Sequence, residues 1–305
     1  MSDTESKTKK KESLNTRFQK FEGRRITGDL WSQQVRAKTE KLLTRTTSGA
    51  IYTITILVCL YLGPVTTAFL IAAMAWLCCS EFFRMMRMCG RMPSETVGLA
   101  AAVAFPIAAL LPYIWLKGII LVFALLSAAW YLFTPRANIS DVAITIFGPL
   151  YTGLLWTSAV NIRMVDPGNR GAFLTFAVMG SIWLNDTFAY FVGTKFGKHK
   201  MAPRISPNKS WEGFAGGMVG SIFVWVLIYS LSVVDITLIQ AVLTALVVGL
   251  SSVMGDLFES RIKRGVGVKD SGNVMPGHGG LLDRSDSLLF GLTAANFMLC
   301  LGGIL

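Results

Sequence analysis

Charge is scarce in this chain of 305 residues: Asp, Glu, Lys and Arg make up 15% of it, against about a quarter in soluble domains. Hydrophobic residues make up 52%, and the mean hydropathy is +0.52. This composition excludes an ordinary soluble enzyme domain. We therefore expect an all-α, polytopic integral membrane protein that folds in the lipid bilayer.

Ligand-type residues are also few. Five cysteines occur without a CxxC pair, and the two histidines do not stand at metal-ligand spacing from them, which excludes a zinc site of the usual kind. We interpret the cysteines as small apolar residues of the core. Residues 1–45 are polar throughout, so we expect no cleavable signal peptide and a cytosolic N-terminus.

Nine stretches are apolar enough to cross the hydrocarbon, which takes about 20 residues per helix. An alternative for the first two is one long bent helix over 46–83, because only Gly63-Pro64 separates them. The predicted transmembrane helices are 46–62, 64–83, 95–112, 117–133, 142–161, 171–193, 214–234, 236–255 and 288–305. They divide the chain into a cytosolic basic tail (1–45), an N-terminal scaffold (46–170) with a lipid-facing groove, and a C-terminal catalytic region (171–305). Within the tail we expect disorder over 1–12, followed by an interfacial amphipathic helix or a flexible linker over 13–45.

The distribution of basic residues predicts the orientation. With nine spans and the N-terminus inside, 26 of the 29 Lys and Arg residues fall on the cytosolic side, and Lys117, Arg163 and Arg170 fall outside. This asymmetry follows the positive-inside rule. It places the polar segments 194–213 and 256–287 together in the cytosol, at the inner membrane of a cell or its equivalent. The net charge of +11 is thus a signal of topology and of attraction to anionic lipid, not of nucleic-acid binding.

One aspartate interrupts an apolar run. Asp186 lies inside the sixth predicted span, where an aspartate costs about 2.5–3.5 kcal/mol on insertion scales. It either binds a metal, a cation or a substrate hydroxyl, or makes a structural hydrogen bond to another helix. The basic cluster at 195–200 that follows lacks the spacing of a P-loop and favours lipid headgroups or phosphate.

A second polar block runs from Ser206 to Gly217. Ser210 is a typical N-cap, and a helix that begins near Trp211 would direct backbone N–H groups at an anion beside Lys209. Trp211 is interpreted either as a surface for base stacking or as an interfacial anchor. Gly213, Gly216 and Gly217 lie on one side of the next span and predict close helix packing.

The segment 256–287 holds most of the ionisable residues. Asp256 and Glu259 are three residues apart, as are Asp283 and Asp286, so each pair shares a face where the backbone is helical. Carboxylates in this arrangement suit Mg²⁺, which takes one or two of them and leaves its other positions to water and phosphates. The alternative is a solvated loop whose charges pair with one another. Further candidates for binding phosphate, or for allowing the backbone to approach it, are Lys263, Arg264, Lys269, Gly277, His278, Gly279, Gly280 and Arg284.

This segment resembles the signature of the phosphatidate cytidylyltransferase family through the order Ser260, Lys263-Arg264, Lys269-Asp270, Gly272, Pro276, His278-Gly279-Gly280, Asp283-Arg284 and Asp286. The block 207–213 and Asn185-Asp186 resemble further landmarks of the family. The resemblance covers about residues 180–290. Met275 and Ser285 depart from the usual pattern without removing a charge.

The resemblance implies transfer of CMP from CTP to phosphatidate in the bilayer, with release of pyrophosphate. It implies one or two Mg²⁺ ions with room for a monovalent ion, and a homodimer. Asp256 and Asp283 are the first choices for metal ligands, with Asp286 and Asp186 in support, and Asp283→Asn should abolish turnover in a protein that still folds. The other residues implied in catalysis or substrate binding are Lys209, Ser210, Trp211, Glu212, Lys263, Arg264, Lys269, Asp270, His278, Gly279, Gly280 and Arg284.

Other functions fit part of this pattern. A transporter or lipid flippase would use Asp186 and the cytosolic carboxylates to bind a coupling ion. A CTP-dependent lipid kinase would transfer the γ-phosphate and release CDP. CDP-alcohol phosphotransferases are disfavoured because their Asp-Gly and Ala-Arg motif is absent.

Overall fold

The computed structural model describes residues 39–40 and 43–305. By its internal contacts the chain divides into residues 1–50 and 51–305, and every candidate site residue lies in the second unit. The predicted tail and interfacial segment lie outside the described residues, apart from 39–40 and 43–45. Six helices among the described residues are long and apolar enough to span a membrane, as expected of a polytopic membrane protein.

The helices follow the order of the predicted spans. Among the described residues, the first candidate membrane span is the helical segment Leu43–Leu62. The N-terminal group continues with α2 (Pro64–Met88), α3 (Glu95–Ala108), α4 (Tyr113–Phe133), α5 (Ile139–Pro149), a π-helical turn η1 (Leu150–Leu154) and α6 (Thr157–Met164). The C-terminal group comprises α7 (Asn169–Phe196), α8 (Trp211–Ser230), α9 (Leu238–Val266) and α10 (Leu282–Leu301). The helices α5, η1 and α6 form one continuous run, Ile139–Met164, which corresponds to the predicted span 142–161. Each of the nine predicted spans therefore has a helix at its place. Three of these helices, α3, α7 and α10, are not among the six that are long and apolar enough to span a membrane.

The chain breaks sharply between the first helix and α2. Gly63 has φ of 134°, a backbone conformation that residues with a Cβ rarely adopt, and Pro64 begins α2. The alternative of one long bent helix over 46–83 is therefore wrong.

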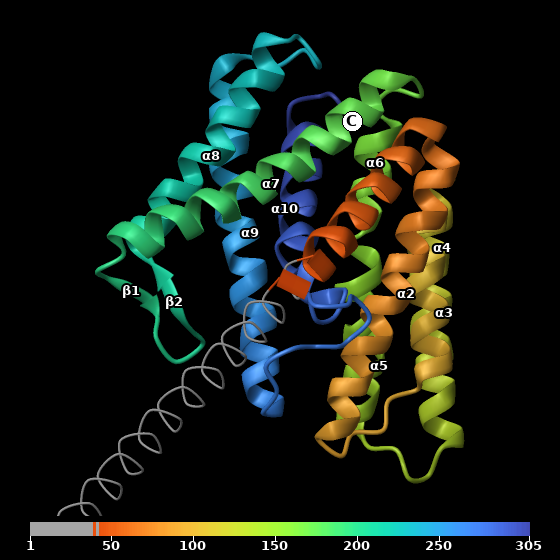
Figure 1. Cartoon of the computed structure of the whole chain (residues 1–305). Helices are drawn as coiled ribbons and strands as arrows, with labels where there is room; N and C mark the ends of the chain where they lie inside the picture. Colours follow the sequence, from red (N-terminus) through yellow and green to blue (C-terminus); the bar gives the residue numbers. More distant parts are fainter. Residues whose placement is uncertain (1–38, 41–42) are drawn as a thin grey trace, which may run out of the picture. The chain divides into compact units, whose positions relative to one another are not determined.

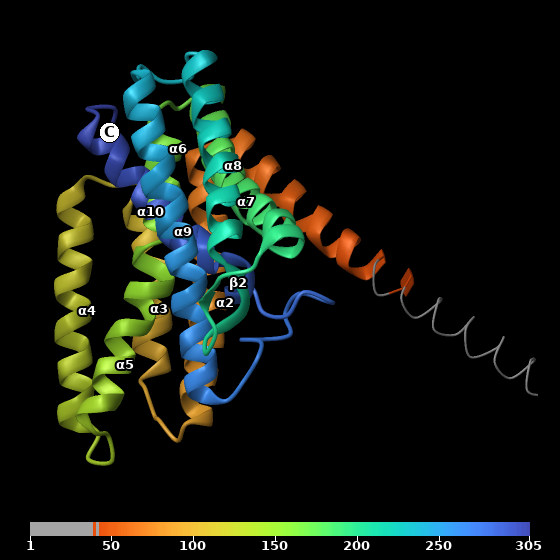
Figure 2. The ribbon, with the colours of Figure 1, turned by 90° about the vertical axis from the view of Figure 1, so that its left-hand side faces the viewer.

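One short antiparallel pair departs from the all-α prediction. Strands β1 (Lys200–Ala202) and β2 (Ser206–Ser210) form a hairpin between α7 and α8 (Figures 1 and 2). Pro203 and Pro207 disfavour a helix here, because each lacks an N–H donor and restricts the residue before it to extended backbone. The hairpin delivers Lys209 and Ser210 to the start of α8.

The end of α9 differs from the prediction. The span was expected to stop at 255, but the helix continues to Val266 and ends at Gly267, which has φ of 80°. That conformation is the usual left-handed helix end, and it favours glycine. Asp256, Glu259 and Lys263 are therefore helical residues, and the loop begins only after them. Figure 1 shows this loop running from the end of α9 towards α2.

The predicted close packing of Gly213, Gly216 and Gly217 is confirmed, since the glycines of α8 lie against α7. A Cβ atom at Gly217 would lie 2.8 Å from the backbone oxygen of Asn185, and one at Gly213 would lie 2.8 Å from that of Ala189. The backbones approach this closely because the small residues leave no side chain between them.

Gly217→Ala is expected to lower the melting temperature of the purified protein in detergent, because overpacking of this kind costs about 1–3 kcal/mol. Gly180→Ala in α7 is the matched control, since no atom lies within 4 Å of the added methyl group. The control should melt at or above the wild-type temperature, because alanine is the better helix former. Equal melting of the two variants would contradict the close contact between α7 and α8.

Candidate functional site

One cavity of about 400 Å³ collects polar residues from α7, β2, α9, α10 and the loop before α10. The segments that supply them are far apart in sequence but pack together through the contacts of α7 with α8, α8 with α9 and α9 with α10. The candidate residues that line this cavity are Asp186, Lys209, Ser210, Asp256, Lys263, Asp270, Asp283, Arg284 and Asp286. We call it the acidic cavity.

Asp256 and Lys209 form an ion pair at the wall of the acidic cavity. The Lys209 Nζ atom lies 2.6 Å from Asp256 Oδ2, and Ser260 Oγ donates to the other carboxylate oxygen at 3.1 Å. Ser210, the next residue of β2, is buried, and its Oγ accepts the Gly213 N–H at 3.1 Å as the predicted N-cap of α8. The start of α8 is thus fixed beside a lysine that already has a carboxylate partner.

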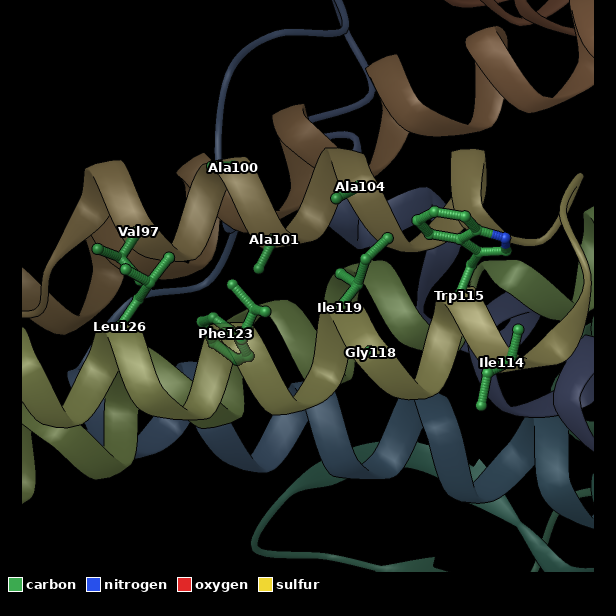
Figure 3. A pocket seen from close by; sticks show the side chains of 11 residues that line it. Val97, Ala100, Ala101, Ala104, Ile114, Trp115, Gly118, Ile119, Phe123 and Leu126 are labelled. Atoms are coloured by element: carbon green, nitrogen blue, oxygen red, sulfur yellow. The ribbon is translucent and has the colours of Figure 1, made fainter.

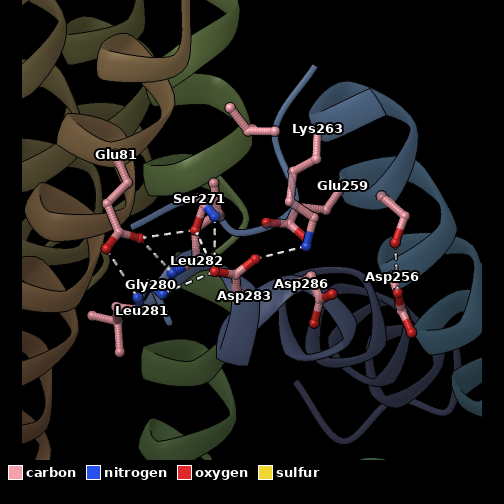
Figure 4. Close-up of polar contacts among 12 residues, drawn as sticks. Glu81, Asp256, Glu259, Lys263, Ser271, Gly280, Leu281, Leu282, Asp283 and Asp286 are labelled. Atoms are coloured by element: carbon pink, nitrogen blue, oxygen red, sulfur yellow. Dashed lines mark hydrogen bonds and ion pairs between the residues drawn. The ribbon is translucent and has the colours of Figure 1, made fainter. Parts of the chain in front are cut away.

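Lys263 lies between two carboxylates. Its Nζ donates to Asp283 Oδ1 at 2.6 Å and contacts Glu259, whose side chain is fully buried one helical turn earlier (Figure 4). Two carboxylates around one ammonium leave this cluster with a net negative charge when all three groups are ionised. Glu259 thus keeps Lys263 directed at Asp283.

Asp283 accepts hydrogen bonds at both carboxylate oxygens. Besides Lys263 at Oδ1, its Oδ2 accepts the Ser271 N–H at 2.8 Å, the Ser271 hydroxyl at 3.0 Å and the Gly280 N–H at 2.8 Å. These bonds connect the two ends of the loop before α10 to the first turn of that helix.

Asp286 lies one turn further along α10 and has a different environment. It is 9% exposed, and its Oδ1 accepts the N–H of Ser287 at 2.7 Å. Across residues 43–305, no Lys, Arg or His lies within 4.0 Å of its carboxylate oxygens. Asp186 from α7 lines the same cavity. The lining thus holds five aspartates against three basic side chains, Lys209, Lys263 and Arg284, so the cavity carries a net negative charge when all of them are ionised and attracts cations.

Other predicted residues lie outside the lining of the acidic cavity. Trp211 is 56% exposed, and Glu212 turns back to His199, whose Nδ1 lies 2.6 Å from the carboxylate. Arg264 donates to the Val268 carbonyl. Lys269 is exposed.

The residues His278, Gly279 and Gly280 shape the loop before α10. The His278 N–H donates to the carbonyl of Met275 at 2.9 Å, and Met275 in turn pairs with Gly279 as an isolated bridge. Gly279 has φ of 90°, which favours glycine. The loop is therefore a compact, hydrogen-bonded turn and not a freely solvated connection.

The donor chemistry of the acidic cavity fits Mg²⁺ that arrives with phosphate. No three His, Cys, Asp or Glu side chains in the described part of the chain converge as a metal cage. Mg²⁺ does not require one, because it commonly keeps water and substrate phosphates around one or two carboxylates. Asp256 and Asp286 line the same cavity and supply two such carboxylates.

Sequence reasoning missed Glu81 in α2, and it paired Glu259 with Asp256 as carboxylates for Mg²⁺, whereas Glu259 contacts Lys263 and does not line the acidic cavity. Glu81 and Glu259 are buried, at 3% and 0% exposure. The signal for Glu81 was the one used for Asp186, an acidic residue within an apolar run, but its partners lie 190 to 201 residues away in the sequence.

A separate groove of about 630 Å³ lies between α3 and α4 (Figure 3). Its lining holds no charged side chain, which excludes it as a site for a nucleotide. The residues that line it are Val97, Ala100, Ala101, Ala104, Ile114, Trp115, Gly118, Ile119, Val122, Phe123 and Leu126.

Comparison with known proteins supplies independent findings. Residues 43–301 match the model of the cytidylyltransferase family. The chain is 40% identical over 161 residues to the phosphatidate cytidylyltransferase of Bacillus subtilis (strain 168). The aligned residues make up 53% of this chain and 59% of the relative. The chain is also 40% identical over 168 residues to the phosphatidate cytidylyltransferase of Mycobacterium tuberculosis (strain ATCC 25618 / H37Rv), covering 55% of this chain and 50% of the relative. The chain thus spans between half and three fifths of the length of these two relatives.

Proposed function

Because this chain belongs to the cytidylyltransferase family, we propose that it transfers CMP from CTP to phosphatidate and releases CDP-diacylglycerol and pyrophosphate. The observation that carries the proposal is the acidic cavity, in which five aspartates and three basic side chains from separate helices, a hairpin and a loop meet. A nucleotidyl transfer needs such a mixture, because a divalent cation and several phosphates must be held together.

The chemistry requires charge control more than proton transfer. The second pKa of a phosphomonoester is about 6, so phosphatidate at neutral pH is largely a dianion and already a nucleophile. A phosphate oxygen of phosphatidate forms a bond to the α-phosphorus of CTP, the bond from that phosphorus to the bridging oxygen breaks, and pyrophosphate leaves. The main obstacle is repulsion between the dianion and the triphosphate.

Asp256 and Asp286 are the proposed ligands of Mg²⁺, with Asp186 as a third carboxylate and room for a second ion. When bound, Mg²⁺ would neutralise charge on the transferred and departing phosphates. Asp283 is proposed to fix Lys263 and the loop before α10, because both of its oxygens already accept protein hydrogen bonds. This assignment differs from the sequence expectation, which made Asp283 a first-choice ligand.

Phosphate binding is proposed for Lys209, Arg284 and the start of α8. Lys209 would exchange its contact with Asp256 for phosphate as the carboxylate turns to the metal. Backbone N–H groups at the first turn of α8 favour an anion there. Ser210 keeps that turn in place, and Asp270 lines the same space. The roles of Trp211, Glu212, Arg264, Lys269 and His278 remain proposals from the family resemblance.

The location of the reaction is proposed from the charge asymmetry. Of the 29 Lys and Arg residues, 26 fall on one side of the membrane when the helices are threaded in order, and that side carries the acidic cavity. This supports a cytosolic active site and N-terminus, where CTP is available. A homodimer is a further proposal from the family resemblance.

Purified protein in detergent is expected to convert phosphatidate, MgCl₂ and CTP labelled at the α-phosphorus into labelled lipid and an equal amount of pyrophosphate. Omitting Mg²⁺ or adding a chelator should abolish both products. CTP labelled at the γ-phosphorus is the control, and its label should appear only in pyrophosphate. Label from the γ-phosphate in the lipid would establish a lipid kinase, and absence of any CTP-dependent product in folded protein would favour a transporter.

A further inference from the structure

Glu81 is a buried carboxylate in α2 whose hydrogen bonds all come from the region of the acidic cavity. Its Oε1 accepts the Leu281 N–H at 3.1 Å, and its Oε2 accepts the Leu282 N–H at 2.8 Å (Figure 4). Oε2 also lies 3.3 Å from the Ser271 hydroxyl, which shares its one proton between Glu81 and Asp283. It makes no ion pair within the described part of the chain. A buried carboxylate without a cation is tolerated only where several donors stabilise it, as these do.

The bonds to Glu81 complete the start of α10. The first N–H groups of a helix have no partner within it, and a local Ser, Thr, Asp or Asn commonly supplies one. Leu281 occupies the N-cap position of α10 and has no such side chain. Glu81 supplies the missing acceptors from another helix, and its negative charge also suits a helix N-terminus. The turn it holds carries Asp283 and Arg284 and leads to Asp286 one turn later, and all three line the acidic cavity.

The loop is built to fit this carboxylate. A Cβ atom at Gly272 would lie 2.2 Å from Glu81 Oε1, and one at Gly280 would lie 2.6 Å from Oε2. Arg84, one turn further along α2, donates to the carbonyl of Ser271. The end of α2 therefore binds both ends of the loop, and glycine at both positions permits the close approach.

We infer that Glu81 is a positioning residue for nucleotidyl transfer: it orients the first turn of α10, and with it Asp286, towards the substrate phosphates and their metal. The inference rests on the proposed function. A continuous path of contacts runs from Glu81 through Ser271, Asp283 and Lys263 to Glu259 (Figure 4). It extends the active site into the N-terminal helices, which the sequence predicted to be scaffold.

Glu81→Gln tests the inference with nearly the same side-chain volume. The amide NH₂ group replaces one acceptor and faces a backbone N–H of α10, so the helix start must shift. Displacement of reacting groups by about 1 Å costs on the order of 10²-fold in rate. We expect kcat to fall by about that factor and the Mg²⁺ concentration for half-maximal activity to rise several-fold, with a smaller change in the KM for CTP.

A second readout does not depend on turnover. Mg²⁺ with CTP should raise the melting temperature of the wild-type protein, because a ligand that binds only the folded state stabilises it. This rise should be smaller for Glu81→Gln and for Gly272→Ala, which pushes a methyl group into the same carboxylate and leaves its charge intact. Glu95→Gln is the matched control, since Glu95 pairs with Arg87 at the start of α3 and contacts no residue of the loop.

The outcomes separate the two proposals. If Glu81 only stabilised the fold, both variants would melt earlier, but the surviving enzyme would keep the wild-type Mg²⁺ half-saturation and the wild-type stabilisation by Mg²⁺ with CTP. That result would overturn the inference. Absence of labelled lipid with wild-type protein would instead overturn the proposed function, while the melting experiment would still report whether Glu81 positions the site.

Discussion

Asp286→Asn is expected to lose about 10³-fold in CMP transfer while melting no lower than the wild-type protein. The carboxylate is buried, lines the acidic cavity and has no cation within 4.0 Å among residues 43–305. Its charged neighbours, Asp256 and Glu259, repel it when all are ionised. Asparagine retains the oxygen that accepts the Ser287 N–H and removes this repulsion, so the fold has no reason to weaken. The loss of a metal ligand, however, removes stabilisation of charge on the reacting phosphates.

Two measurements on the same sample check this expectation: the rate of lipid labelling at saturating Mg²⁺, and the melting temperature in detergent without ligand. Asp235→Asn serves as the control, because Asp235 lies outside the acidic cavity in the connection between α8 and α9. It should match the wild-type protein in both measurements. A drop in the melting temperature of Asp286→Asn by several degrees would mean that the carboxylate is structural and that the metal ligands lie elsewhere.

The positions of the helices were predictable because each depends on a local property. A run of about 20 apolar residues is favourable in the bilayer wherever it occurs, and Gly63-Pro64 marks a break by the intrinsic geometry of those two residues. The end of α9 was missed by eleven residues, since Asp256 to Val266 are polar enough to resemble a loop. Three of their charged side chains, Asp256, Glu259 and Lys263, form ion pairs within the fold and so suit a helix packed against protein. Gly267, a typical helix end, was the better guide.

The members of the site were predictable from the signature, but their pairing was not. The sequence offers Lys209 and Lys263 as free cations for phosphate, whereas each contacts a carboxylate in the folded chain. Spacing in sequence does not reveal such pairs, because Lys209 and Asp256 come from a hairpin and a helix that meet only in the fold. Glu81 was missed for the same reason: its hydrogen-bond partners come from the other end of the chain.

Asp283→Asn is expected to abolish CMP transfer and also to destabilise the protein by about 3 kcal/mol, the usual cost of breaking a buried ion pair. From the sequence alone, loss of turnover with an intact fold was predicted. The contacts change the second half of that prediction. In one orientation the asparagine oxygen accepts from Lys263, and the asparagine NH₂ group then faces the N–H groups of Ser271 and Gly280. In the flipped orientation the asparagine NH₂ group faces the Lys263 ammonium. Either orientation leaves buried donors without an acceptor.

The comparison of the two aspartate variants separates their roles. Asp283→Asn should melt well below Asp286→Asn, although both are strongly impaired in CMP transfer, because only Asp283 joins the loop, α9 and α10 through its hydrogen bonds. Both are measured under identical detergent and lipid conditions, with the fraction of folded protein determined by size-exclusion chromatography. If Asp283→Asn melts like the wild-type protein and is inactive, Asp283 acts mainly as a metal ligand, as the signature alone implies. The loop before α10 would then depend on Glu81 and Arg84 for its position, and the expected effect of Glu81→Gln would grow accordingly.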